Sequence, residues 1–121
     1  MDLIAKHGKV SVIAHRGYSG KYPENTMLAF EKAIEIGADY IELDVHKTAD
    51  GKIIVNHDLT TGRVGDISLN VETSTWEELQ KVNLKMDQRI PLLDDVFKLC
   101  KGKIGIQIEI KQADIAKDVY D

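Results

Sequence analysis

Cysteine, proline and long apolar runs are scarce in this sequence of 121 residues. It contains one cysteine, Cys100, and two prolines. A single thiol can form no internal disulfide and cannot supply a four-thiolate zinc site. No run of 18 apolar residues occurs, so no segment is predicted to span a membrane. The first nine residues also lack the apolar stretch of a signal peptide, and we therefore expect a cytoplasmic protein.

A basic surplus is missing as well. Sixteen Lys and Arg residues stand against 20 Asp and Glu residues, which gives a formal net charge of −4. Because nucleic-acid binding requires cations that neutralise phosphates, a nucleic-acid partner is not expected. The composition instead suits a globular chain: 43% of the residues are hydrophobic and 30% are charged. This is enough apolar content for a core, and we expect a single domain over residues 1–121.

Strand and helix patterns alternate along the chain. Four segments carry strand patterns: 10–14, 40–47, 53–55 and 104–111. Helical spacing follows Asn25, which is the expected N-cap, and follows Pro91; the tail 113–121 is compatible with the start of another helix. The segment 59–89 is polar and turn-rich, with a capping-box pattern at Thr75 and Glu78. This order predicts an α/β architecture with an excursion at 59–89.

The strands at 40–47 and 53–55 are too close for a parallel connection. Only residues 48–52 separate them, whereas a parallel crossover needs about a dozen residues or more. Asp50-Gly51 is a strong two-residue turn signal, so we favour a hairpin over an extended return. Such a turn would place Asp44 opposite His57. A register slip of one residue would destroy that pairing.

Polar residues gather where the predicted strands end. They are His15 after the first strand, Glu42 and Asp44 on one face of the second, His57 after the third, and Glu109 and Lys111 on one face of the last. Taken singly, each of these residues is typical of a solvated surface. Ligands of α/β sheets bind beyond the carboxyl ends of the strands, however, and we expect these groups, joined by Arg16, to form one site.

Three carboxylates in one site need a cation. Burying carboxylates together is costly without a positive partner. The oxygens of Glu42, Asp44 and Glu109 are hard ligands and suit Mg²⁺ or Ca²⁺ better than a softer metal. The remaining histidines, His7 and His46, are expected to be surface residues.

In combination, these residues resemble the glycerophosphodiester phosphodiesterase family. The matching stretches run in family order over residues 10–111: Ala14-His15-Arg16-Gly17, Pro23-Glu24-Asn25-Thr26, Gly37-Ala38-Asp39, Ile41-Glu42-Leu43-Asp44-Val45, Asp50-Gly51, Val55-Asn56-His57-Asp58, Ile90-Pro91-Leu92 and Ile108-Glu109-Ile110-Lys111. The combination is highly specific, although a single tetrapeptide is not.

The resemblance implies a phosphodiesterase on a TIM-barrel scaffold that acts on a small-molecule phosphodiester. It implies that His15 and His57 are the general acid and base, in either order. Glu42, Asp44 and Glu109 would hold one divalent cation, and Arg16 and Lys111 would contact the phosphate. Direct attack by water and a first attack by a substrate hydroxyl, which forms a cyclic phosphate, are both compatible with these residues.

Length is the departure from the family pattern. A TIM barrel takes about 250 residues, whereas this chain has 121. We therefore expect an N-terminal half-barrel with a family-type insertion at 59–89. A half-barrel leaves sheet edges and apolar faces uncovered, so we expect a homodimer or larger homo-oligomer. The alternative is a truncated or engineered half-barrel that self-associates or binds metal without useful turnover.

Overall fold

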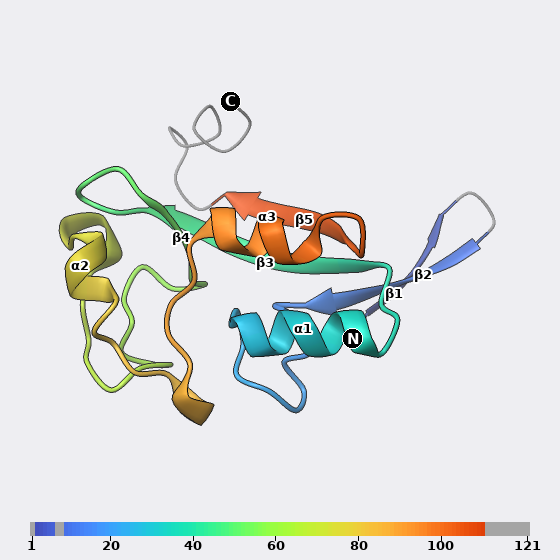
Figure 1. The fold of residues 1–121 in the computed structure, drawn as a ribbon, viewed down its shortest axis with the longest axis horizontal. Coiled ribbons are helices and arrows are strands. Elements are labelled where there is room, and N and C mark those ends of the chain that lie inside the picture. Colours follow the sequence, from blue (N-terminus) through green and yellow to red (C-terminus); the bar gives the residue numbers. More distant parts are fainter. Residues whose placement is uncertain (1, 7–8, 111–121) are drawn as a thin grey trace.

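The computed structural model describes residues 2–6 and 9–110; His7, Lys111 and the tail 113–121, for which the sequence gives predictions, lie outside them. Pairs of consecutive strands and helical segments follow one another along the chain, as Figure 1 shows. The strands are β1 (Asp2–Lys6), β2 (Lys9–His15), β3 (Tyr40–Lys47), β4 (Ile53–Val55) and β5 (Gly105–Ile110). The helices are α1 (Met27–Glu35), α2 (Trp76–Leu79) and α3 (Leu93–Cys100), with short 3₁₀ turns η1 (Val71–Thr73) and η2 (Lys85–Asp87). This confirms the predicted α/β class.

The sheet is built around β3. Strands β2 and β5 are parallel to β3 and pair with its opposite edges, so Glu42 lies between His15 and Gln107. β4 runs antiparallel to the end of β3, on the edge that β2 leaves free. Because β2, β3 and β5 run in one direction, their carboxyl ends meet at one side of the sheet (Figure 1). β1, which pairs antiparallel with β2, was not predicted from the sequence.

Helices α1 and α3 cover one face of the sheet (Figure 1). Phe30 of α1 and Val96 of α3 are fully buried with Ile41 and Leu43 of β3 in one core cluster. Since side chains alternate along a strand, the intervening residues of β3 face the other side. The sheet therefore has a covered apolar face and a polar face.

None of the helices in the described ranges is long and apolar enough to cross a bilayer.

The start of α1 differs from the prediction. Thr26, not Asn25, is the N-cap: its hydroxyl accepts a hydrogen bond from the Ala29 N–H at 3.1 Å. Asn25 instead adopts a positive φ of 53° and is buried. The predicted end of the helix is confirmed, since Gly37 has a φ of 79° just past α1, a conformation that glycine adopts without steric cost. The displaced cap leaves the Asn25 side chain for another role.

The hairpin between β3 and β4 is confirmed, but its register is shifted by one residue. The loop consists of residues 49–51. The Thr48 N–H closes it by donating to the Lys52 carbonyl, and the Gly51 N–H donates to the Thr48 carbonyl. Gly51 has a φ of 84°. The expected two-residue turn is thus a three-residue loop. The Thr48 hydroxyl stabilises it by bonding Asp50 and the Lys52 N–H.

This register corrects the pairing predicted for Asp44. The pairs within the hairpin are Val45–Val55, His46–Ile54 and Lys47–Ile53. Asp44 consequently lies opposite Asn56, whose N–H donates to the Asp44 carbonyl at 3.0 Å, and not opposite His57. His57 follows the end of β4, so its position is set by the loop after the strand.

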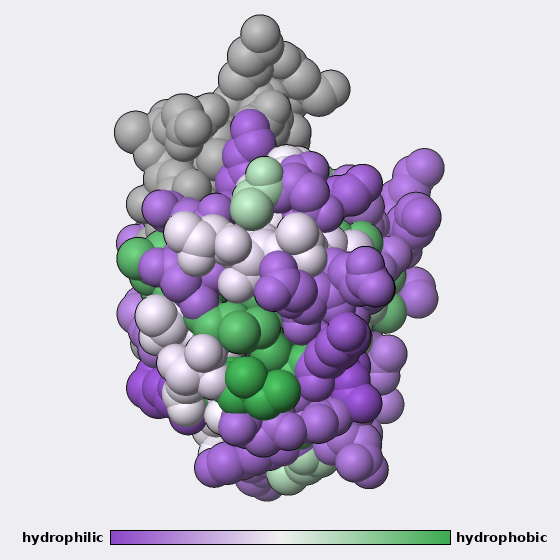
Figure 2. Space-filling model, turned by 90° about the vertical axis from the view of Figure 1, so that its left-hand side faces the viewer, coloured by the Kyte–Doolittle hydropathy of each residue, from purple (hydrophilic) through white to green (hydrophobic). Residues whose placement is uncertain are grey.

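The connection between β4 and α3, residues 56–92, has a small core of its own. Val71, Leu79 and Val82 are fully buried there against Ile54 of β4. The predicted capping box is present at the start of α2: the Thr75 hydroxyl accepts from the Glu78 N–H while the Glu78 carboxylate accepts from the Thr75 N–H. Figure 2, viewed from the left of Figure 1, shows a compact apolar patch bordered by hydrophilic residues and by residues of intermediate hydropathy.

Gly17 fixes the β2–α1 loop against α1. A Cβ at this position would lie 2.8 Å from the Ala29 Cβ and 2.9 Å from the Ala29 carbonyl carbon, and the φ of Gly17 is 79°. We expect Gly17→Ala to lower the free energy of unfolding by about 2–4 kcal/mol, because left-handed strain and overpacking add. Urea unfolding measures this. The control is Gly20→Ala in the same loop, where an added Cβ would lie within 4 Å of no described residue other than its chain neighbours. Equal stability of the two variants would contradict the prediction.

Candidate active site

Three carboxylates meet at the carboxyl ends of β3 and β5, as the sequence predicts. Glu42 and Asp44 are two residues apart on β3 and therefore share one face of the strand. Asp44 is paired with Glu109 on the neighbouring strand β5. One ligand oxygen from each of the three lies within 4.8 Å of the other two. Asp44 is fully buried, the side chain of Glu42 is largely buried and Glu109 is exposed. The parallel pairing of two strands thus brings together carboxylates that are far apart in sequence.

The charges of this cluster fit a hard divalent cation. Among the described residues, Glu42 Oε1 is buried and has no hydrogen-bond partner. Burial and then the nearby negative charge of Asp44 raise the pKa of Glu42, while His15 acts in the opposite direction. A buried carboxylate oxygen without a donor, next to a second buried carboxylate, is unfavourable unless a cation compensates it. The three oxygens are the ligand type that Mg²⁺ and Ca²⁺ prefer.

Asp44 is held by two residues of the β2–α1 loop. The Asn25 Nδ2 donates to Asp44 Oδ2 at 3.2 Å, and the Arg16 Nε lies 3.7 Å from the same oxygen. The loop is tied to the sheet by the Arg16 N–H, which donates to the Glu42 carbonyl at 2.7 Å, and to itself by the Asn25 N–H, which donates to the Arg16 carbonyl. Both Arg16 and Asn25 have a positive φ. The loop geometry therefore orients a predicted metal ligand.

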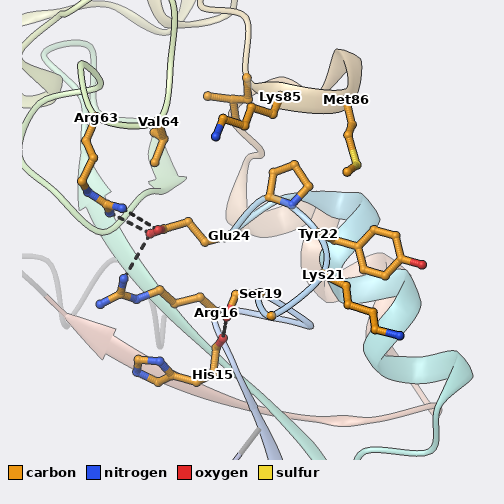
Figure 3. Close-up of a pocket in the computed structure, with 13 residues that line it drawn as sticks. His15, Arg16, Ser19, Lys21, Tyr22, Glu24, Arg63, Val64, Lys85 and Met86 are labelled. Atoms are coloured by element: carbon orange, nitrogen blue, oxygen red, sulfur yellow. Dashed lines mark hydrogen bonds and ion pairs between the residues drawn. The ribbon is translucent and has the colours of Figure 1, made fainter.

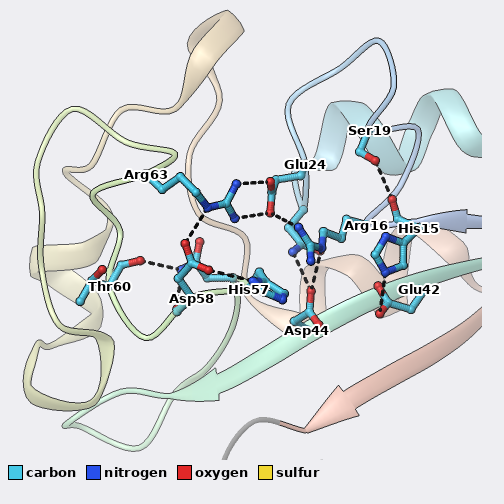
Figure 4. Close-up of polar contacts among 12 residues, drawn as sticks. His15, Arg16, Ser19, Glu24, Glu42, Asp44, His57, Asp58, Thr60 and Arg63 are labelled. Carbon is cyan, nitrogen blue, oxygen red and sulfur yellow. Dashed lines mark hydrogen bonds and ion pairs between the residues drawn. The ribbon is translucent and has the colours of Figure 1, made fainter.

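The two histidines occupy different environments. His15 ends β2 and is about half exposed, with its Nε2 3.6 Å from Glu42 Oε2. His57 is partly buried, and its Nδ1 lies 2.8 Å from Asp58 Oδ1. Since a carboxylate only accepts, Nδ1 carries the proton in this contact and Nε2 is the nitrogen left for chemistry. In the view of Figure 4, the His57 ring extends from Asp58 toward Arg16 and Asp44.

His46 is not the surface residue that the sequence suggested. It is buried, with 4% of its surface exposed, and its Nε2 donates to the carbonyl oxygen of His57 at 3.1 Å. His46 lies two residues after Asp44 on β3, so it shares the polar face of the strand. The hydrogen bond ties the backbone of His57 to the sheet.

Glu24, Asp58 and Arg63 complete the polar network, and sequence reasoning gave Asp58 and Arg63 no role. The Arg63 Nη1 and Nη2 donate to the two carboxylate oxygens of Glu24 at 2.7 and 2.9 Å, and its Nε donates to Asp58 Oδ2 at 2.7 Å. Glu24 Oε2 also accepts from Arg16 Nη1 at 3.3 Å. The hydrogen bond from Arg63 is the largest factor that lowers the pKa of both carboxyl groups.

A cleft of about 460 Å³ opens beside this network (Figure 3). His15 and Arg16 border it on the side of the carboxylates, and Tyr22, Lys85 and Met86 belong to the remaining wall. Met86 is 58% exposed and has a φ of 57°. The β2–α1 loop and the β4–α3 connection thus form the walls of the cleft. Lys111, the second predicted phosphate contact, lies outside the described residues.

Acids, histidines and an arginine gathered beyond the ends of parallel strands form a site suited to the chemistry of phosphate esters. The model of the glycerophosphoryl diester phosphodiesterase family matches residues 15–121, and the chain belongs to that family. A curated relative from Caldanaerobacter subterraneus subsp. tengcongensis, named glycerophosphodiester phosphodiesterase, is 44% identical over 111 residues. The match covers 85% of this chain and 46% of the relative.

Solved structures agree with this assignment. A glycerophosphodiester phosphodiesterase from Thermotoga maritima superposes with a TM-score of 0.83 at 41% identity, covering 94% of this chain and 49% of that one. A phosphodiesterase from Oleispira antarctica, solved with the product sn-glycerol-3-phosphate, gives 0.80 at 28% identity and covers 84% and 44%. The chain spans about half the length of the relatives it matches.

Proposed function

We propose that this protein hydrolyses glycerophosphodiesters to an alcohol and glycerol phosphate, with Mg²⁺ or Ca²⁺ held by Glu42, Asp44 and Glu109. The observation that carries the proposal is the approach of three carboxylates to within 4.8 Å of one another, beside the imidazole of His15. Membership of the phosphodiesterase family supports the reaction class. Glu42 Oε1 is buried and accepts no hydrogen bond from the described part of the chain, which supports the cation.

The reaction needs charge neutralisation and two proton transfers. The cation, when bound, supplies positive charge to the phosphate oxygens. Arg16 and Lys111 are proposed to contact the phosphate. One of His15 and His57 takes the proton of the attacking hydroxyl, and the other protonates the leaving alkoxide. Since the Nδ1 of His57 bonds Asp58, its Nε2 is the proposed reacting nitrogen. The same groups serve whether water or a hydroxyl of the substrate attacks first.

The alcohol of the substrate is proposed to lie in the cleft of about 460 Å³. His15 and Arg16 border both the carboxylate cluster and this cleft, so a phosphate held at Arg16 would lie next to the cleft. The wall combines the apolar Met86 and the ring of Tyr22 with Lys85. Such a mixed wall accommodates an alcohol with polar and apolar parts.

The finer architecture is also a proposal. The sheet is proposed to be an N-terminal half-barrel of the TIM-barrel type, with residues 59–89 as an insertion. The outer edge of β5 pairs with no strand among the described residues. An exposed strand edge is a template for pairing with another chain, and this supports the proposed homodimer or larger homo-oligomer.

A second candidate is a half-barrel that binds a cation or self-associates without useful turnover. One observation favours it. Glu109 lies on β5 and is exposed, so within the described residues the carboxylate cluster is open on that side. An open site admits water and loses the low-dielectric surroundings that strengthen electrostatic catalysis.

Hydrolysis of a glycerophosphodiester by the purified chain separates the two candidates. We expect turnover of glycerophosphocholine or glycerophosphoethanolamine with Mg²⁺ or Ca²⁺, and loss of turnover with a chelator or in His15→Ala. Static light scattering of the same sample measures the molar mass, which we expect to exceed that of one chain. A folded sample that binds the cation, seen as a metal-induced rise in Tm, but shows no turnover would establish the second candidate instead.

A further inference from the structure

Arg63 uses its whole guanidinium group to join two segments of the chain. Its Nη1 and Nη2 bond both oxygens of Glu24 in the β2–α1 loop, and its Nε bonds Asp58 at the beginning of the β4–α3 connection, with distances of 2.7–2.9 Å. The side chain is half exposed. Single ion pairs at such exposure are weak, but a bidentate contact within a network fixes geometry. The network therefore specifies how the two segments meet.

One end of the network reaches the arginine that is proposed to contact phosphate. Glu24 Oε2 accepts from both Arg63 and Arg16, and Arg16 Nε also faces Asp44. Without Arg63, the whole negative charge of Glu24 would act on Arg16 and compete with a phosphate for it. Arg63 balances that charge, so Arg16 stays oriented by Glu24 without being neutralised by it.

The other end reaches His57. Asp58 presents one oxygen to Arg63 and the other to the Nδ1 of His57. The contacts with Arg63 and with His57 both keep the pKa of Asp58 below its usual range, so the carboxylate remains an acceptor. With Asp58 held in place, His57 keeps its proton on Nδ1 and its ring in one orientation.

We propose that Arg63 is a positioning residue that fixes His57 and Arg16 relative to each other. It acts on His57 through Asp58 and on Arg16 through Glu24. The inference rests on the proposed function for its kinetic consequence. It goes further because it gives a second arginine, outside the acid, base, metal and phosphate sets, control over the position of one histidine and of Arg16. Close placement of reacting groups matters strongly, since displacement by about 1 Å costs about 10²-fold in rate.

A purely structural role makes a different prediction. If Arg63 only fastened the connection to the loop, its loss would lower stability and the fraction of folded protein, while each folded molecule would keep its turnover number. A positioning role lowers kcat of the folded molecule, because the protonated nitrogen of His57 and the direction of Arg16 are no longer fixed.

The kinetic experiment compares Arg63→Ala, Arg63→Lys and a control, Arg89→Ala. Arg89 is an exposed arginine of the same connection that donates to the Gln88 carbonyl. We expect kcat to fall about 10²-fold in Arg63→Ala, to fall less in Arg63→Lys, which has one point of attachment in place of a fork, and to stay unchanged in Arg89→Ala. Guanidinium at non-denaturing concentration should restore part of kcat in Arg63→Ala.

A spectroscopic measurement tests the same proposal without turnover. The ¹⁵N shifts of the imidazole ring report which nitrogen carries the proton. We expect His57 to be protonated at Nδ1 in the wild type and in Arg89→Ala at a pH where the ring is neutral. Arg63→Ala should show a mixture of the two tautomers. This arm stays informative if the wild type hydrolyses no glycerophosphodiester, so failure of the proposed function and failure of this inference are distinguishable.

Two results would overturn the proposal. One is an Arg63→Ala protein that is folded and keeps kcat within twofold of the wild type. The other is a His57 tautomer that stays on Nδ1 in Arg63→Ala. If Arg63→Ala does not fold, Arg63→Lys takes its place in both measurements, and an unchanged kcat and tautomer in that variant count against the proposal.

Discussion

Replacing Glu42 by Gln should abolish most turnover while making the metal-free protein more stable. The substitution keeps the size of the side chain but removes one of three ligand charges, and a metal in such a site supplies several kcal/mol of transition-state stabilisation. A loss of about 10³-fold in kcat/KM follows, since each 1.36 kcal/mol is a factor of about ten. The metal-free protein gains stability because a buried charge next to Asp44 is gone. Its Tm should rise by several degrees.

Thermal unfolding with and without the cation is the second measurement on this variant. Binding to the folded state alone stabilises a protein in proportion to the logarithm of ligand concentration. The wild type should therefore gain Tm on addition of Mg²⁺ or Ca²⁺, and Glu42→Gln should gain little. Glu31→Gln, a matched change on the exposed side of α1, should behave as the wild type in both assays. If Glu42→Gln keeps the metal-induced rise in Tm, Glu42 is not a ligand.

The sequence pattern located the carboxylates because strand periodicity is local information. Alternation along residues 40–47 places Glu42 and Asp44 on one face, whatever the neighbouring strands are. The position of Glu109 followed from the rule that parallel strands present their carboxyl ends at one side. The register that pairs Asp44 with Glu109 was beyond the sequence pattern, since it depends on how α3 packs before β5.

The hairpin shows how a local signal can fail by one residue. Asp50-Gly51 marked the turn correctly, but the dipeptide is compatible with a two-residue turn and with a three-residue loop that ends in a glycine of positive φ. The side chain of Thr48 favours the longer loop through its contacts with Asp50 and Lys52. Such a competition between side-chain and backbone hydrogen bonds is not readable from hydrophobic alternation.

The roles of Asn25 and Arg63 depend on tertiary contacts. Asn25 looked like a helix cap because asparagine is a common cap, yet a φ of 53° turns it away from α1 and toward Asp44. Arg63 meets Glu24 across 39 positions of sequence. It comes from a polar segment with no regular period, where no pattern indicates a partner.

Removal of either histidine should lower kcat by about 10²–10⁴-fold, the usual contribution of general acid or base catalysis. The fold should tolerate both changes, because the side chain of His15 is 47% exposed and that of His57 is 31% exposed. The metal-induced rise in Tm should persist in His57→Ala, in contrast to Glu42→Gln, since His57 is not among the proposed ligands. The double variant should lose less than the product of the single losses, because the two residues act in one reaction.

A substrate with an activated leaving group assigns the roles of the two histidines. In a p-nitrophenyl phosphodiester of glycerol, the leaving group is p-nitrophenolate. It leaves as a stable anion and needs no proton from the enzyme. The variant that lacks the general acid should therefore approach the wild-type rate on this substrate, while the variant that lacks the general base stays slow. Wild-type kcat in both His15→Ala and His57→Ala on the natural substrate would refute the two-histidine mechanism. Recovery of both variants on the activated substrate would mean that neither histidine is the base.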